Sequence, residues 1–232
     1  MIMTHIMYYI AITILLLCQL DANAFHSTSF PPLLDVPVYS LSTLGSSDNG
    51  NGTTTNNKST MNILTYATPV SIKPYRMWSI SLYKGTLSHE NFTRNRRGIL
   101  QLLCPEHASC KGKSGVEGEL IRLLGGSSGN DIDKRILCEE MGYEWENLPN
   151  EKEEDIEWPS VLPSCIYYLK LELVGDMIDC GSHEVALCKV VSMISSEEIT
   201  DASEELDSLS TRQLRRDSII SELGRVIPLD ND

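Results

Sequence analysis

The chain has 232 residues, 41% of them hydrophobic, and a formal net charge of −13 at pH 7. This length predicts one globular domain, and it exceeds that of small proteins held together mainly by disulfides. The acidic balance argues against nucleic acid or an anionic membrane as a partner, because such surfaces are bound mainly by Lys and Arg.

The chain begins with an apolar run typical of a signal peptide. Residues 8–20 read YYIAITILLLCQL, which is too short to span a membrane comfortably, and the small residues Ala22 and Ala24 follow. We therefore expect residues 1–24 to be a signal peptide, with no membrane span in the mature chain. Residues 25–58 are rich in Ser, Thr, Asn and Gly and lack hydrophobic periodicity, which predicts a disordered segment resembling a transit peptide.

This N-terminal arrangement resembles the bipartite presequence of algae whose plastids lie inside membranes derived from the endoplasmic reticulum. In those presequences an aromatic residue directly follows the cleavage site, as Phe25 does here in ANAF. The resemblance implies transport to the plastid through the endoplasmic reticulum. Secretion is the alternative.

Strand-like periodicity starts near residue 61 and continues to about residue 193. Residues 61–91 are expected to form two strands joined by a loop that contains proline, because apolar and polar residues alternate in YRMWSISLY. Further strands are predicted at residues 98–104, 165–174 and 183–193.

Short helices are predicted between some of these strands and in the tail. Three are expected at residues 88–96, 116–124 and 131–141, with Ser88 and Asp131 as N-caps. Residues 196–232 form the fourth expected part of the chain, a helical tail lying against the barrel or a partner subunit. The strands lack a regular β–α alternation, so the pattern favours an antiparallel barrel with peripheral helices.

Several common catalytic motifs are missing from the sequence. No G-x-G-x-x-G follows a predicted strand, and the phosphate-loop, zinc-hydrolase and serine-hydrolase motifs do not occur. CPEHASC places Cys104, His107 and Cys110 at metal-ligand spacing, but no fourth donor lies nearby. We therefore interpret these residues as packed side chains and predict no metal site. The cysteines after the signal peptide lack the spacing of a disulfide framework, which favours reduced thiols.

The stretch from residue 61 to residue 91 is rich in hydroxyls and contains the cations Lys73 and Lys84. Hydroxyls, backbone amides and a cation suit a bound phosphate, whereas acid–base catalysis needs a titratable group tuned near neutral pH. The alternative interpretation is an ordinary exposed strand face, on which Ser and Thr are common.

The same stretch resembles the N-terminal signature of the flavin reductase-like family, the FMN-binding split barrels. NILTYATPVSIKPYRMWSISLYKGTLSHENF matches that signature at Asn62, Thr65, Ala67, Lys84 and Thr86. A second block, LKLELVGDMIDCGSHEVALCKVVSM, resembles the closing strands of the family. The resemblance implies a six-stranded antiparallel Greek-key split barrel over residues 59–195, usually a homodimer, with FMN near the subunit interface.

The resemblance also assigns roles to individual residues. It implies that the flavin ring and ribityl chain contact Thr65, Tyr66, Ala67 and Thr68. Lys84 and Thr86 would bind the phosphate, with Ser81 beside them.

His183 would lie next to the nicotinamide as the catalytic residue, and Ser182 stands where the family usually has Asp. The implied function is an oxidoreductase that transfers hydride from NAD(P)H to FMN, with FAD as a possible flavin. The alternative is a split barrel that binds a flavin or another small ligand without turnover.

Overall fold

The computed structural model describes residues 33–45, 58–112, 115–149, 157–195 and 207–227. Almost all of them belong to one compact unit, which begins at Leu34. The predicted signal peptide lies outside the described residues, as do residues 25–32 and 46–57 of the segment expected to be disordered. Within the described part of the chain, no helix has the length and apolar character needed to cross a membrane.

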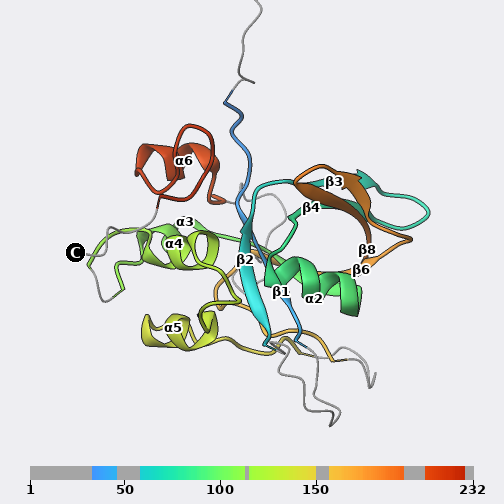
Figure 1. Ribbon diagram of the computed structural model, residues 1–232, viewed down its shortest axis with the longest axis horizontal. Coiled ribbons are helices and arrows are strands. Elements are labelled where there is room, and N and C mark those ends of the chain that lie inside the picture. The colour runs from blue at the N-terminus through green and yellow to red at the C-terminus, as the bar shows by residue number, and fades with distance from the viewer. Residues whose placement is uncertain (1–32, 46–57, 113–114, 150–156, 196–206, 228–232) are drawn as a thin grey trace, which may run out of the picture. The chain divides into compact units, whose positions relative to one another are not determined.

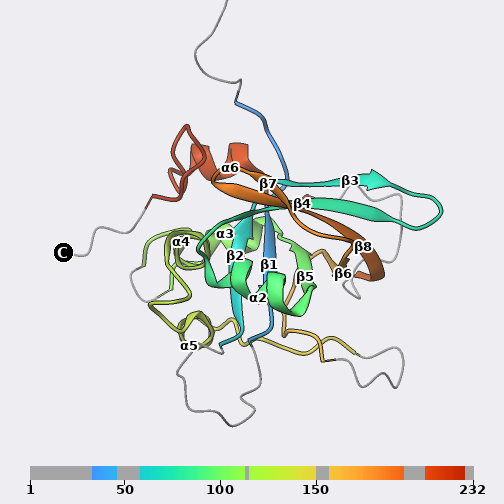
Figure 2. The same cartoon turned by 45° about the vertical axis from the view of Figure 1, so that its right-hand side comes forward.

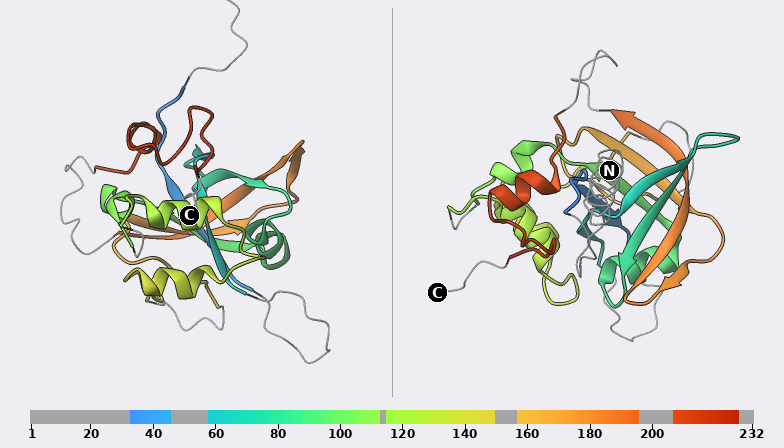
Figure 3. Two further views of the ribbon diagram at one scale, coloured as in Figure 1. Left: turned by 60° about the vertical axis from the view of Figure 1, so that its left-hand side comes forward. Right: turned by 90° about the horizontal axis from the view of Figure 1, so that it is seen from above.

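The fold is built on one antiparallel sheet that curls into a half-barrel (Figures 1 and 3). Its eight strands are β1 (Tyr39–Thr43), β2 (Thr60–Leu64), β3 (Ala67–Ser71), β4 (Met77–Tyr83), β5 (Arg97–Leu102), β6 (Tyr167–Leu173), β7 (Ile178–Cys180) and β8 (His183–Ser195). The strand order is β2-β1-β5-β6-β8-β4-β3, and β7 pairs with β8. β2 and β3 are therefore the two ends of the path, although they follow each other in the chain.

The prediction of six strands was too low. β7 is a short strand in a region interpreted as a turn, and β1 lies in the segment expected to be disordered. All five residues of β1 are buried, and β1 pairs with β2 on one side and β5 on the other. The hydroxyl of Ser42 donates to the carbonyl of Ser160 at 2.6 Å. Polar side chains are therefore accommodated inside the fold, and the expectation of disorder is wrong for this strand.

The three helices predicted between the strands are present, and one short helix after β5 is added. The helices are α2 (Leu87–Asn95), α3 (Pro105–Ser109), α4 (Glu119–Gly126), α5 (Lys134–Glu140) and α6 (Thr211–Arg216). The N-caps of α2 and α5 are Thr86 and Asp133, whose side chains accept backbone N–H groups, so the prediction of Ser88 and Asp131 was wrong. α6 lies within the predicted helical tail and packs on the core through Leu214, and the described residues 217–227 after it contain no further helix.

Two hydrophobic clusters hold these elements together. One cluster includes Val38, Met61, Ile99, Leu120 and Leu214, and it joins β2, β5 and the residue before β1 to the helices α3 to α6. Figure 1 shows α4, α5 and α6 on one side of β2, with α2 and the strands β3, β4 and β8 on the other. The second cluster lies within the curl and contains Leu41, Ile80, Phe92, Leu171 and Ala186.

Helix α2 packs closely inside the curl. It contacts β1, β2 and β4, and Figure 2 shows it next to β1 and β2 with β4 passing above in that view. Gly98 in β5 allows this approach. A Cβ atom there would lie 2.9 Å from the carbonyl oxygen of Ser42 and 3.1 Å from the ring of Phe92.

Lys134 connects three elements of the helical side. It is only 4% exposed, and its Nζ donates to the carbonyl oxygens of Met61 in β2 (3.0 Å) and Leu124 in α4 (2.6 Å). Burial lowers the pKa of Lys134 from its ordinary 10.5 to about 8. The residue that follows Met61 in β2 is Asn62, which lines the pocket described next.

Candidate functional site

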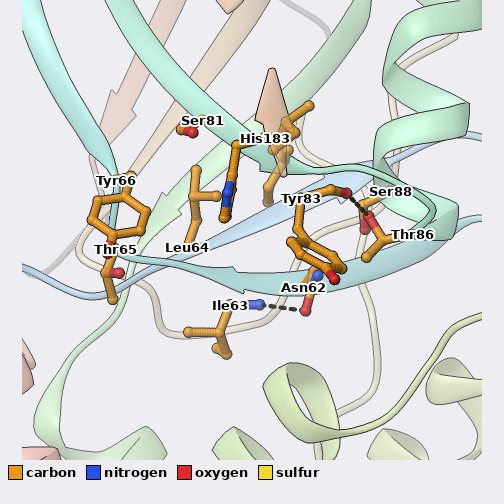
Figure 4. A pocket seen from close by; sticks show the side chains of 12 residues that line it. Asn62, Ile63, Leu64, Thr65, Tyr66, Ser81, Tyr83, Thr86, Ser88 and His183 are labelled. Carbon is orange, nitrogen blue, oxygen red and sulfur yellow. Dashed lines mark hydrogen bonds between the residues drawn. The ribbon is translucent and has the colours of Figure 1, made fainter. Parts of the chain in front are cut away.

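A pocket lies where the two ends of the strand path meet. β2 stops at Leu64 and β3 starts at Ala67, so Thr65 and Tyr66 form the link between the outermost strands. Both line the pocket (Figure 4). The complete lining consists of Leu41, Asn62, Ile63, Leu64, Thr65, Tyr66, Ser81, Leu82, Tyr83, Thr86, Ser88 and His183. Residues of β2, β4, α2 and β8 therefore all contribute to this pocket at the split between the strands.

Three aromatic rings gather at the pocket. Figure 4 shows the His183 ring between those of Tyr66 and Tyr83. The ring centroids lie 6.0 Å apart for the Tyr66 pair and 5.3 Å apart for the Tyr83 pair, and both contacts are edge-on. Tyr66 is 67% exposed and Tyr83 is 57% exposed. Large exposed rings beside a pocket provide a surface on which a planar ligand can stack.

The His183 ring is also held by its neighbour in the chain. Its Nδ1 lies 2.9 Å from the Ser182 hydroxyl oxygen. The side chain that the resemblance assigned to catalysis is thus oriented by a hydroxyl on one side and by aromatic rings on two others.

The N-terminus of α2 forms the polar end of the pocket. The Thr86 hydroxyl donates to the carbonyl oxygen of Tyr83 (2.9 Å) and accepts the N–H of His89 (3.3 Å). The N–H groups of Leu87 and Ser88, the first two helical residues, have no intrahelical acceptor. Such N–H groups, together with the helix dipole, favour an anion.

The polar lining fits a ligand rich in acceptor atoms. Within the described chain, the hydroxyls of Thr65, Ser81 and Ser88 have no hydrogen-bond partner, and neither has the amide nitrogen of Asn62. The lining contains no carboxylate and no Lys or Arg. A phosphate, ribityl hydroxyls and the carbonyls of a flavin ring would match this set of donors, so the residues present fit FMN.

The structure brings together most of the residues predicted from sequence. Thr65, Tyr66, Ser81, Thr86 and His183 all line the pocket. Their assignment to flavin and nicotinamide remains a prediction.

Three other predicted residues lie outside the lining: Ala67, Thr68 and Lys84. Thr68 is exposed in β3. The Lys84 ammonium forms an ion pair with Asp179, at 2.7 Å from Nζ to Oδ2.

Tyr83 and Ser88 were missed as site residues. Ser88 was interpreted as the helix cap, but Thr86 takes that role and leaves the Ser88 hydroxyl at the pocket. Two hydroxyl residues separated by one position at a helix start provided the signal that could have identified Ser88. Asn62, which matched the family signature without a role, also lines the pocket.

The cysteine–histidine motif forms a structural cap. The N–H of Cys104 donates to Nδ1 of His107 (3.2 Å), and Nε2 of His107 lies 3.1 Å from the carbonyl oxygen of Pro163. Burial lowers the pKa of His107 and raises that of Cys104 to about 12. Both ring nitrogens are thus engaged. In the described ranges, no group of three or more His, Cys, Asp or Glu residues is arranged to hold a metal ion.

Comparison of the sequence with known families and curated proteins finds no relative. No family model matches the sequence. No curated protein matches it either.

Solved structures match the fold over most of the chain. Flavoredoxin from Methanosarcina acetivorans aligns with a TM-score of 0.58 and 14% identity, covering 81% of this chain and 86% of that one. An FMN-binding protein from Thermus thermophilus gives 0.56 and 14%, covering 81% and 90%. A putative flavin reductase from Haemophilus somnus gives 0.51 and 15%, covering 72% and 84%. The chain therefore has the split-barrel fold of these flavin proteins.

Proposed function

We propose that the chain binds FMN in this pocket and acts as a flavin reductase-like oxidoreductase, with NAD(P)H as hydride donor. One observation carries the proposal. Five residues that the sequence resemblance assigns to flavin and nicotinamide converge on one pocket with unpaired donors, from the β2–β3 link, β4, the start of α2 and β8. The named activities of the structural neighbours support the same class, and FAD is the alternative flavin.

The residues divide into a phosphate end and a ring end. The hydroxyls of Thr86 and Ser88 and the free N–H groups at the start of α2 would hold the phosphate, with Lys84 as the cation nearest in sequence. Thr65 and Ser81 would donate to the ribityl chain and ring. The pocket volume of about 140 Å³ is smaller than that of common cofactor sites, so part of the flavin would lie over the exposed tyrosines.

In this proposal, bound flavin supplies the hydride-accepting ring, while the protein orients it and the nicotinamide. His183 is placed to position the nicotinamide, because its ring is held by Ser182 and Tyr83 at the pocket. The absence of any carboxylate from the lining agrees with a mechanism in which the protein provides binding and orientation.

A lining without a carboxylate also suits an alternative, a split barrel that binds flavin or another small ligand without turnover. Absorption spectra and FMN titration of the purified protein test binding, which should quench flavin fluorescence. Stopped-flow mixing with NADH and NADPH then tests turnover. Flavin binding without bleaching by either nucleotide would favour the alternative, and no quenching at any FMN concentration would contradict both.

We further propose that the chain forms a homodimer. Exposed apolar side chains gather on the β3–β4 hairpin and on β8: Val70, Ile72, Tyr75, Val191 and Met193. Contacts between Lys189 and the Tyr75 ring, and between Arg76 and Met193, join these two parts. A second copy would cover this surface. Analytical ultracentrifugation should show a dimer, and Ile72→Asp with Val191→Asp should give a monomer. A monomeric wild-type protein would contradict the proposal.

Finally, we propose that residues 1–32 direct the protein to a plastid through the endoplasmic reticulum. A fluorescent protein fused to these residues should reach the plastid, and Phe25→Ala should leave it in the endoplasmic reticulum or its derived compartments. Secretion of the unmutated fusion would contradict the proposal and support the alternative, that the protein is secreted.

A further inference from the structure

Two turns meet beside the pocket and are joined through Lys84. Its backbone N–H donates to the carbonyl oxygen of Ser182 at 3.0 Å, which fixes the β4–α2 turn against the β7–β8 turn. Its ammonium also contacts the carboxylate of Asp179, at 2.7 Å. The Lys84 and Asp179 side chains are 34% and 69% exposed, so water can reach this ion pair.

Asp179 lies in β7 and is held by the turn that follows. Its Oδ1 accepts the backbone N–H of Gly181 at 2.8 Å, and Gly181 adopts a φ of +79° that closes the turn. The neighbouring ammonium of Lys84 and the N–H of Gly181 hold the pKa of the Asp179 carboxyl below its ordinary value. Asp179 is therefore a fixed, charged acceptor, whereas Lys84 has a long and flexible side chain.

Lys84 sits next to the anion-binding end of the pocket. It lies between the lining residues Tyr83 and Thr86, and the hydrogen bond from the Thr86 hydroxyl to the Tyr83 carbonyl closes this turn. Gly85 follows with a φ of +79°. A lysine side chain extends roughly 6 Å from its Cα, about the span of such a turn. The lining contains no Lys or Arg. Lys84 is the lysine or arginine nearest in sequence to Thr86 and Ser88, so it is the candidate cation for this end of the pocket.

We propose that Asp179 is the resting counter-ion of Lys84, and that an anionic ligand group at the start of α2 takes Lys84 away from it. The inference rests on the proposed binding of a phosphorylated flavin. An exposed ion pair contributes little stability, so the exchange costs little. A phosphate carries more charge than a carboxylate and forms strong charge-assisted hydrogen bonds with an ammonium.

This exchange gives Asp179 a role in ligand selection. When no phosphate is present, Lys84 is neutralised by Asp179. When a phosphate binds, Asp179 loses its partner and leaves a negative charge near the ligand. Asp179 therefore weakens the binding of phosphorylated ligands and leaves that of unphosphorylated ones unchanged, which sets how strongly the pocket prefers FMN over riboflavin.

The test is a double-mutant cycle with two ligands. FMN and riboflavin are titrated into the full chain and into Asp179→Asn, Lys84→Ala and the double variant, and flavin fluorescence gives each Kd. Asp179→Asn should bind FMN roughly three to ten times more tightly, because a competing partner and a like charge are both removed. Riboflavin affinity should not change. The gain should shrink in the Lys84→Ala background, since only the repulsion then remains.

Asp176→Asn is the matched control. It removes the same charge from the β6–β7 connection, and Asp176 forms no ion pair within the described residues. Equal FMN affinity in wild type and Asp179→Asn would overturn the inference, as would an equal gain for riboflavin or for Asp176→Asn.

A failure of the proposed function looks different, because the wild-type chain would then bind neither flavin. In that case, calorimetric titration of the same four proteins with inorganic phosphate would still test whether an anion takes Lys84 from Asp179. Tighter phosphate binding by Asp179→Asn would support it, and unchanged or absent binding would overturn it.

Discussion

His183 and Tyr83 are direct cross-strand partners, the final pair in the antiparallel ladder between β8 and β4. Their rings meet edge-on, with centroids 5.3 Å apart and planes at 72°. The register of two long strands therefore fixes the aromatic side of the pocket. A shift of β8 by one residue would turn the His183 ring to the opposite face of the sheet from Tyr83, so the site depends on this register.

His183→Ala should separate flavin binding from flavin reduction. If the imidazole positions the nicotinamide, FMN affinity should remain close to the wild-type value while the rate of NAD(P)H-driven reduction falls. Losing one positioning contact commonly costs a factor of about ten to a hundred. Stopped-flow bleaching of the flavin measures the rate, and fluorescence titration measures the affinity. An unchanged reduction rate would show that His183 only completes the turn into β8.

Ser88→Ala tests the polar end of the pocket. Ser88 is a buried residue that lines the pocket, and its hydroxyl has no partner in the described chain, so the substitution should cost little stability. Losing a hydrogen bond to a charged phosphate should weaken FMN binding roughly tenfold or more, with a much smaller effect on riboflavin. Ser79→Ala is the control, because Ser79 lies on β4 outside the lining. Equal FMN affinities in the two variants would remove Ser88 from the site.

Lys134 should give stability a distinctive dependence on pH. Its folded pKa of about 8 lies below the ordinary 10.5, so between these values the unfolded chain binds more protons than the folded one. The cost of burying the ammonium is present in full below pH 8 and disappears as pH rises towards 10.5. Relative to Lys134→Met, the free energy of unfolding of the wild type should therefore rise across this window, by at most about 3 kcal/mol.

Urea unfolding at several pH values from 7 to 10 measures this difference. Burial raises the pKa values of Cys138 and Cys188, which lowers stability as the unfolded thiols ionise above pH 9. Both proteins contain Cys188, whose effect therefore cancels in the comparison. The effect of Cys138 differs between them, because the Lys134 ammonium lowers the pKa of that thiol. Parallel curves for wild type and Lys134→Met would show that Lys134 does not change its protonation in the folded state.

Gly98→Ala should destabilise the packing of α2 inside the curl. The added methyl group would press on the Ser42 carbonyl and the Phe92 ring, and overpacking of this kind costs roughly 1–3 kcal/mol. Thr93→Ala, on the exposed side of α2, should change stability by less than about 0.5 kcal/mol. Calorimetric unfolding compares the two, and similar melting temperatures would show that the sheet can shift to accept the methyl group.

Sequence patterns predicted the parts of the fold that have a clear period. β4 alternates buried Ile80 and Leu82 with less buried neighbours, and the strand was predicted from that alternation. β1 has the same period but combines Leu41 with Ser40 and Ser42, and it is buried on both faces. Its serines fit because the structure places a helical layer and its connecting segments behind the strand. The partner of the Ser42 hydroxyl, the Ser160 carbonyl, is distant in sequence, so local composition indicated disorder.

The site was predicted in outline for a related reason. Residues 62–88 supply most of the lining in one continuous stretch, so the family signature located the pocket. The partner of Lys84 could not be predicted in this way. Asp179 contacts Lys84 because β7 and β4 both pair with β8. This strand pairing cannot be predicted from the separation of the two residues in the sequence.

The link between β2 and β3 has a mechanical consequence. Thr65 and Tyr66 tie the two free margins of an open sheet, and both line the pocket. A ligand bound there would contact both edge strands at once, so it would restrain the distance between β2 and β3. Backbone amides of β2 and β3 should then exchange with deuterium in step, both slower when the pocket is filled and both faster when it is empty.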